Sequence, residues 1–318
     1  MDWPERIGRR IKLRDLHVLL AIVQSGSITK AARQLAISQP VVSKVVADLE
    51  QVLGVRLLDR DRHGAEATIY GAALLRRGIA AFDELKQGVK EIEFLKGAAG
   101  GELRLGASAP MVEGLLPVIL NRLQLDHPLL TIDITQSNTG PALYRELRDR
   151  NIDLIVGRMN LPIDDDLSAE VLFDDPLLVV AGPTNPLLRG RKLELRQLMD
   201  EPWILPQAST ARTVIEETFA ACQLGLPRAN VVSNSFALYE AMLASGPLLA
   251  MWPASMLLLG IRRHFVRPLP VLLPDLPRPV GIVTLKRRMA GPLAQLFIDD
   301  ARDVARSIQK DRPRKKRV

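Results

Sequence analysis

Three polar side chains stand at helical spacing in a segment that is otherwise rich in small apolar residues. Gln39, Ser43 and Lys44 lie within SITKAARQLAISQPVVSKVVADLEQVLG, which runs from Ser27 to Gly54. A glutamine amide can bond an adenine edge twice, a serine hydroxyl can contact a base or a phosphate, and a lysine ammonium can reach guanine or phosphate. These residue types suit the reading of a nucleic acid, provided that the chain exposes them on one surface.

Three short helices would position these side chains. Apolar residues recur at steps of three and four over 16–23 and 42–53, which predicts two amphipathic helices. Ser27 and Ser38 are of the type that caps a helix N-terminus, and a short helix with alanines at 31–32 lies between them. A tight turn before the third helix predicts a helix-turn-helix, whose third helix places its N-terminal outer side in the DNA major groove.

The segment 55–68 predicts two short strands around an Arg-His-Gly tip, a wing that would carry two arginines toward the phosphate backbone. The residues alone also allow a plain three-helix bundle with solvated charges, so this alternative stays open. If the region binds DNA, the expected contacts are Ser27, Lys30, Ser38, Gln39, Pro40, Ser43, Lys44, Arg60 and Arg62.

A longer helix is expected over 71–96, where no proline occurs. Phe82, Leu85, Val89 and Ile92 recur at steps of three, four and three. This 3.5-residue period is typical of a seam that packs against a partner helix, although the helix could instead pack on its own domain.

The remainder alternates between strand-like and helix-like segments. The run 102–158 includes one helix expected over 111–125 and predicts a parallel sheet flanked by helices. The alternation recurs more loosely over 177–253. A strand at 280–286 and a helix at 292–308 are expected to return to the first lobe.

Ligands of open α/β sheets bind beyond the carboxyl ends of strands, often against helix N-termini. The hydroxyl and amide residues that follow strands could equally be helix N-caps, and the arginine could be part of a surface ion pair. The candidates for ligand binding are Ser108, Asn138, Thr139, Arg158, Gln207, Ser209, Thr210, Asn234 and Phe236.

Charge is distributed unevenly along the 318 residues, whose net charge is +7. Residues 1–65 hold eleven Lys/Arg and seven Asp/Glu, and the tail 312–318 holds five basic residues, so the middle is slightly acidic. A basic end on a near-neutral body is typical of polyanion binding. The tail could also be only a solvated terminus.

The sequence favours a cytoplasmic protein without membrane contact. Its N-terminus lacks the apolar core of a secretory signal, and the stretch 246–261 is interrupted by prolines and too short to span a bilayer. The single Cys222 suits a reducing compartment.

Catalytic motifs are missing from the sequence. The four histidines match no metal-ligand spacing, and no phosphate-binding loop, nucleophile elbow or clustered acidic pair occurs. Cys222, within an apolar segment, is expected to be a buried thiol. We therefore expect neither an enzyme, nor a metal, nor a cofactor.

The first seventy residues resemble the N-terminal signature of LysR-type transcriptional regulators. Two departures are visible, at Leu58, where the family usually has Phe, and at Ala67, where it usually has Leu. Both concern packing beneath the wing. The matching positions are Ser27, Ala31, Ala32, Leu35, Ser38, Gln39, Pro40, Ser43, Leu49, Glu50, Gly54, Leu57, Arg60, Thr68 and Gly71.

This resemblance implies an N-terminal winged helix-turn-helix, a long linker helix and then a two-lobed α/β effector domain like a periplasmic binding protein. The expected boundaries are 1–70 for DNA binding, 71–97 for the dimerising linker, 98–311 for the effector domain and 312–318 for a basic tail. Within the effector domain, lobe I is expected at about 98–165 and 268–308, and lobe II at about 166–267.

The resemblance also implies partners. These are double-stranded DNA, a second copy in a homodimer or homotetramer, a small-molecule co-inducer and RNA polymerase, all in the bacterial cytosol or nucleoid. The overall look is similar to members that control genes for sugar-binding proteins. We therefore expect an effector-responsive activator of a sugar-uptake or catabolic gene, with a sugar or small organic acid as effector. A regulator of aromatic-acid catabolism and a solute-binding protein without a DNA role are the alternatives.

Overall fold

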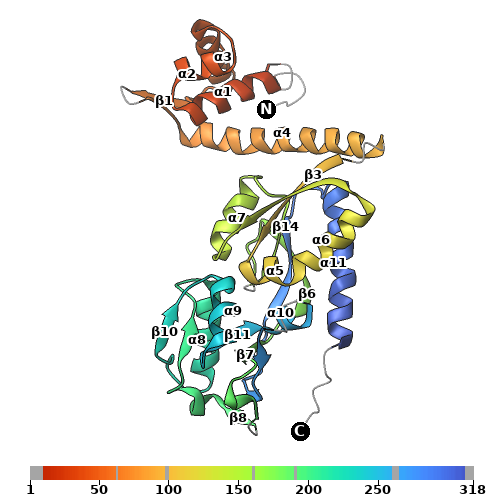
Figure 1. Cartoon of the computed structure of the whole chain (residues 1–318). Coiled ribbons are helices and arrows are strands. Elements are labelled where there is room, and N and C mark those ends of the chain that lie inside the picture. Colours follow the sequence, from red (N-terminus) through yellow and green to blue (C-terminus); the bar gives the residue numbers. More distant parts are fainter. Residues whose placement is uncertain are drawn as a thin grey trace. The chain divides into compact units, whose positions relative to one another are not determined.

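The computed structural model describes residues 10–61, 64–96, 100–159, 162–189, 192–259 and 265–311. The chain forms two compact units, Met1–Val89 and Lys90–Val318 (Figure 1). Within the described ranges, no helix combines the length and the apolar character needed to cross a bilayer.

The first unit is a small helical fold with a two-stranded wing. Its apolar core joins all three short helices to the wing and to the start of the long helix, with Leu19, Ile22, Val42 and Val46 wholly buried. This arrangement confirms the predicted winged helix-turn-helix. The elements are α1 (Leu13–Ser25), α2 (Ile28–Gln34), α3 (Gln39–Leu53), β1 (Leu58–Asp61), β2 (Gly64–Ala67) and α4 (Ile69–Leu95).

Left-handed residues end the helices of this unit and set its turns. Gly26 and Gly54 have φ values of 65° and 70° at the ends of α1 and α3, as their glycines predict. The turn between α2 and α3 is made by Ala36, whose φ is 53° despite its Cβ. The backbone N–H of Ile37 then donates to the carbonyl of Ala32 at 3.0 Å, which keeps the turn tight.

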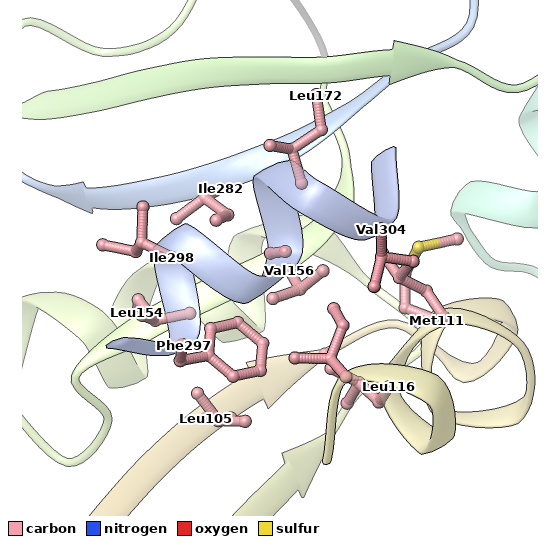
Figure 2. Close-up of a cluster of buried hydrophobic side chains, with 14 of the residues drawn as sticks. Leu105, Met111, Leu116, Leu154, Val156, Leu172, Ile282, Phe297, Ile298 and Val304 are labelled. Carbon is pink, nitrogen blue, oxygen red and sulfur yellow. The ribbon is translucent and has the colours of Figure 1, made fainter. Parts of the chain in front are cut away.

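The first lobe of the second unit is a five-stranded sheet in the order β4-β3-β5-β14-β6. One face is covered by α5, α6 and α11, and Figure 2 shows Phe297 and Ile298 of α11 packed among Leu105, Leu154 and Ile282 of the strands. The other face is covered by α7. The elements are β3 (Gly100–Ala107), α5 (Ala109–Glu113), α6 (Leu115–Asp126), β4 (Leu129–Gln136), α7 (Gly140–Arg148), β5 (Leu154–Arg158), β6 (Leu167–Asp174), β14 (Pro279–Leu285) and α11 (Pro292–Asp311).

The second lobe is a sheet in the order β10-β9-β11-β7-β12, with a small β13-β8 pair beside it. Adjacent residues of β7 serve opposite faces, because Val179 packs toward α8 and Val180 toward α9 and α10. The elements are β7 (Leu177–Ala181), η2 (Pro186–Arg189), β8 (Leu193–Glu194), η3 (Leu195–Leu198), β9 (Trp203–Leu205), α8 (Thr210–Ala221), β10 (Ala229–Val232), α9 (Phe236–Ser245), β11 (Leu249–Pro253), α10 (Ala254–Leu259), β12 (Arg267–Pro268) and β13 (Val271–Leu272).

The two-lobed α/β class is confirmed, but three details of our expectation are wrong. Strand β6 pairs with β14, so lobe I extends past residue 165 to Asp174, and β12 and β13 keep the chain in lobe II beyond residue 268. The first sheet is mixed, because β14 runs antiparallel to both of its neighbours. The helix expected over 111–125 breaks at Gly114, where α5 ends and α6 begins. The other domain boundaries stay predictions, and the tail 312–318 lies outside the described residues.

Two glycines of α4 provide a matched test of packing at the start of this helix. A Cβ on Gly71 would lie 2.1 Å from the carbonyl oxygen of Leu57, whereas one on Gly88 would meet nothing within 4 Å. We expect Gly71→Ala to destabilise the first unit by about 1–3 kcal/mol and Gly88→Ala to stabilise the helix by up to about 1 kcal/mol. Urea unfolding followed by circular dichroism checks both, and equal effects of the two substitutions would contradict the close approach of α4 to Leu57.

Candidate functional site: a nucleic-acid interface and a ligand pocket

Helix α3 has one anchored side and one wet side. Gln39, Pro40 and Lys44 are exposed, and Ser43 is half-buried at the edge of the exposed side. The opposite side faces the core, where the buried residues of α3 are Val42, Val46 and Leu49. The predicted reading side chains therefore lie on the outer surface of a helix that its apolar side holds in place.

The N-terminus of α3 is exposed and lacks a side-chain cap. Ser38 is at the N-cap position, yet its side chain makes no capping bond. Its backbone carbonyl instead accepts from the N–H groups of Val41 at 3.1 Å and Val42 at 3.2 Å, and Pro40 has no N–H. The N-terminus of this 15-residue helix can therefore attract a phosphate mainly through its partial positive charge. Ser27 is already engaged, because its Oγ accepts from the backbone N–H of Lys30 at 3.5 Å. The Lys30 side chain is exposed.

The wing is tied to α3 by a carboxylate. Glu50 Oε1 accepts from the backbone N–H groups of Leu57 at 2.7 Å and Leu58 at 3.3 Å. These bonds fix the start of β1 relative to α3. Arg60 is exposed on β1. The remaining wing candidate, Arg62, lies outside the described residues.

Sequence reasoning missed two residues on the exposed surface of α3. Val41 is 40% exposed, an unusual position for a valine beside an apolar core, and Ala47 is exposed on the Lys44 side. Methyl groups of this kind can contact the thymine methyl in the major groove. Their signal in the sequence was weak, because apolar residues at helical spacing predict core.

A pocket of about 190 Å³ lies between the two lobes of the second unit. Gln207 does not line it and instead orients Asn234. The backbone N–H of Gln207 donates to Asn234 Oδ1 at 3.1 Å, and Asn234 Nδ2 donates to Gln207 Oε1 at 3.3 Å. The other eight predicted ligand-binding residues all line the pocket, namely Ser108, Asn138, Thr139, Arg158, Ser209, Thr210, Asn234 and Phe236.

The alternative that these residues are only N-caps holds for some of them. Ser209 Oγ accepts from the backbone N–H of Arg212 at 3.3 Å and donates to the carbonyl of Gln207 at 2.9 Å, so its hydroxyl serves α8. Ser108 and Thr139 are at the N-cap positions of α5 and α7 but make no side-chain capping bond. Their hydroxyls are therefore the better candidates for contact with a ligand.

Among the described residues, Arg158 has no partner in a surface ion pair. Its Nη2 donates to the backbone carbonyl of Asp175 at 3.1 Å, and its Nη1 is buried without a hydrogen-bond partner in the described chain. Burial lowers the pKa of this guanidinium, although the nearby Asp175 carboxylate acts in the opposite direction.

Sequence reasoning missed the apolar and phenolic part of the lining. Burial raises the phenol pKa of both Tyr144 and Tyr239, so both are neutral donors at physiological pH, and Tyr239 Oη donates to the carbonyl of Ser233 at 2.9 Å. The apolar contributors include Met111, Leu143, Ile155, Val214, Met251 and Val283. These positions read as ordinary core in the sequence.

A main-chain bond closes the pocket on one side. The backbone N–H of Thr210 in the second lobe donates to the carbonyl of Asn138 in the first at 3.1 Å. The lobes therefore meet through backbone atoms beside the side chains that face the ligand space.

The two segments that cross between the lobes are bonded to each other. The backbone N–H of Asp175 donates to the carbonyl of Arg278 at 2.8 Å, and the backbone N–H of Arg278 donates to the carboxylate of Asp174. The Arg278 guanidinium reaches α8, where it bonds Glu217, the carbonyl of Val214 at 3.2 Å and Thr218 Oγ1 at 3.3 Å.

The wholly buried Asp175 fastens the same crossing to α10. Its carboxylate accepts from the backbone N–H of Ser255 at 2.9 Å and from Ser255 Oγ at 2.6 Å, at the start of that helix. These bonds thus link the end of β6 to the segment at Arg278, and both to α8 and α10.

A winged helix-turn-helix joined to a two-lobed domain with a pocket between its lobes defines a ligand-responsive DNA-binding regulator. Residues 13–72 match the family model for the "Bacterial regulatory helix-turn-helix protein, lysR family", and residues 96–306 match the "LysR substrate binding domain". The chain belongs to the LysR family of transcriptional regulators.

Individual relatives agree with this assignment. The transcriptional regulator YdcI of Escherichia coli K12 is 27% identical over 95% of this chain and 98% of its own length. GbpR of Azospirillum brasilense is 33% identical over 74% of this chain and 69% of its own length. The structure of CbnR in complex with its target DNA shares the fold, with a TM-score of 0.58, 21% identity and coverage of 92% of this chain and 99% of that one.

The two pocket serines allow a matched test of the capping analysis. Ser209→Ala removes an N-cap bond and should lower the free energy of unfolding by about 1 kcal/mol. Ser108→Ala removes a hydroxyl that caps nothing, and should change stability far less. Thermal unfolding of the full chain compares them, and a larger loss for Ser108→Ala would show that its hydroxyl is structural.

Proposed function

We propose that this regulator reads its operator with the exposed side of α3 and responds to a small molecule held between its lobes. Gln39, Ser43 and Lys44 would contact base edges. Phosphate contacts would come from the N-terminus of α3 and from basic side chains around it. The DNA-binding residues in this proposal are Ser27, Lys30, Ser38, Gln39, Pro40, Ser43, Lys44, Arg60 and Arg62.

One observation carries this proposal: the side of α3 that presents these polar groups is exposed, whereas its opposite side is wholly buried. Gln39 and Lys44 therefore reach solvent from a helix whose position the core fixes, which is the arrangement that a reading helix requires. The same arrangement places the positive end of the helix dipole on the exposed side.

A second copy of the chain is the proposed partner of α4. Leu85, Val89 and Ile92 recur at steps of four and three and are 54%, 56% and 53% exposed. An apolar stripe of this period buries itself against another helix. Two copies would present two α3 helices to a two-fold symmetric operator.

The pocket supports an effector that biases one arrangement of these copies over another and thereby alters DNA binding. We infer that the controlled genes serve uptake or breakdown of that effector, and that an activator of this kind contacts RNA polymerase. The proposed effector contacts are Ser108, Asn138, Thr139, Arg158, Ser209, Thr210, Asn234 and Phe236, with Gln207 in support of Asn234.

Gln39→Ala tests direct readout. We expect preference for the operator over a scrambled duplex to fall tenfold or more, because a bidentate glutamine–adenine contact contributes about 1–3 kcal/mol of discrimination. Binding to the scrambled duplex, which depends on phosphates and salt, should persist. The operator is first selected from random duplexes with the native protein, and affinities are then measured by fluorescence anisotropy.

Gln51→Ala is the matched control, since Gln51 is also exposed on α3 but lies twelve residues further along the helix. It should leave both affinities unchanged. Equal loss of binding to both duplexes by Gln39→Ala would rule out base readout by this side chain.

Val89→Glu tests the partner helix. A carboxylate placed in an apolar seam loses hydration without gaining a partner, so the variant should sediment as a monomer at concentrations where the native chain is dimeric. Glu91→Lys, at an exposed position two residues from Val89 and therefore on the opposite side of α4, should leave the dimer intact. Unchanged sedimentation of Val89→Glu would place the self-association surface elsewhere.

A further inference from the structure

The lining of the pocket carries a positive charge and no negative charge among the described residues. Among the described residues that line it, Arg158 is the one with a charged side chain, and none of them is Asp, Glu or Lys. Nη2 of the guanidinium donates a hydrogen bond to the carbonyl of Asp175, whereas the buried Nη1 has no hydrogen-bond partner in the described chain. A buried donor of this kind costs free energy until something accepts from it.

Helix termini add to the positive field. The pocket is lined by the first residues of three helices, namely Gly140 of α7, Thr210 of α8 and Phe236 of α9. Each N-terminus carries a partial positive charge. Ser209 and Ser235 already cap α8 and α9, whereas the N-terminus of α7 has no side-chain cap. The guanidinium and the uncapped end of α7 point to an anionic ligand on independent grounds.

Two hydroxyls of the lining could donate further hydrogen bonds to an anion. The side chains of Ser108 and Thr139 line the pocket and make no capping bond. A Cβ on Gly157 would lie 3.6 Å from Ser108 Oγ, so this hydroxyl borders the residue that immediately precedes Arg158. The absence of a side chain at position 157 leaves the space beside it open.

The rest of the lining and the volume limit the body of the ligand. Most of the remaining contacts are apolar, as with Met111, Ile155 and Val214. A cavity of about 150 Å³ holds benzene, so about 190 Å³ suits one six-membered ring with a small substituent. Hydroxyl and amide groups of the lining could pair with some hydroxyls of a sugar, but those that meet the apolar side chains would lose hydration without a partner, which costs free energy.

We propose that the effector is a small monocarboxylic acid with an apolar body of about one six-membered ring, whose carboxylate accepts a hydrogen bond from Nη1 of Arg158. This inference rests on the proposed role of the pocket as the effector site. It narrows the two expected classes, a sugar or an organic acid, to the second.

The decisive measurement uses matched probes on the full chain. Benzoate and benzamide have nearly the same shape, but only benzoate is charged at pH 7.5. Isothermal titration calorimetry should show benzoate binding at least tenfold tighter than benzamide, cyclohexanecarboxylate binding like benzoate, and glucose and galactose not binding. Benzamide or a sugar binding as tightly as benzoate, or no binding of either carboxylate, would overturn the proposal.

Variants locate the site. Arg158→Met should abolish the preference for benzoate over benzamide, whereas Arg145→Met, an exposed arginine on α7, should preserve it. Ala211→Trp should block all ligands, because Ala211 lines the pocket and is the second residue of α8. Circular dichroism of each variant establishes that it is folded, and the benzoate–benzamide comparison on the native chain stands without any variant.

The outcomes separate this inference from the proposed function. If a sugar binds and Ala211→Trp blocks it, the pocket is an effector site and only the acid class is wrong. If benzoate binding survives Ala211→Trp, the acid binds elsewhere and the proposal fails. Operator binding by the unliganded protein, measured by anisotropy, reports on the DNA-binding role independently of either result.

Discussion

The ligand pocket exists because two crossing segments are held side by side. Asp175 and Arg278 are bonded through their backbones, and their side chains reach in different directions, to α10 and to α8. Two further contacts join the lobes, namely the backbone bond between Asn138 and Thr210 and the packing of α10 beside Gly114 at the start of α6. The lining residues come from both lobes, so the shape of the pocket depends on the angle between the lobes that this junction helps to set.

The junction uses buried polar groups, which are costly unless each is satisfied. Asp175 is wholly buried and accepts two hydrogen bonds from Ser255. Arg278, almost as deeply buried, spreads its donors over a carboxylate, a carbonyl and a hydroxyl of one helix. Polar bonds are directional, so they specify one angle between the lobes more closely than apolar packing would.

Arg158 differs from these groups because one of its donors is left over. Its Nη2 holds the carbonyl of Asp175, at the very crossing that sets the lobe angle. A ligand that draws the guanidinium toward itself therefore acts on a group that already touches the junction. In the proposed mechanism, the charge that would attract the ligand and the hydrogen bond that its arrival would alter belong to one side chain.

Features determined by neighbouring residues could be predicted from the sequence. The helix ends at Gly26 and Gly54, the wet side of α3 and the polar residues after strands all follow from short-range pattern, and eight of nine predicted ligand-binding residues do line the pocket. Features that depend on distant contacts could not. Strand β6 lacks clean alternation, and its place in the first sheet depends on β14, more than one hundred residues away.

The role of Gln207 could not be foreseen for the same reason. It follows a strand, like the true lining residues, but its amide is taken by Asn234 from the next strand along the sheet. Likewise, no local pattern in the sequence marks Arg278, and the fold shows that it contacts α8. Partners of long polar side chains are set by tertiary structure, which a local pattern does not report.

The contact that closes the pocket has an evolutionary consequence. It joins the amide of residue 210 to the carbonyl of residue 138, and every residue type except proline supplies such an amide. Side chains around the ligand space can therefore be exchanged by mutation while the backbone hydrogen bond between the lobes is kept. A scaffold of this kind can change its ligand specificity without losing the backbone contact that joins its lobes.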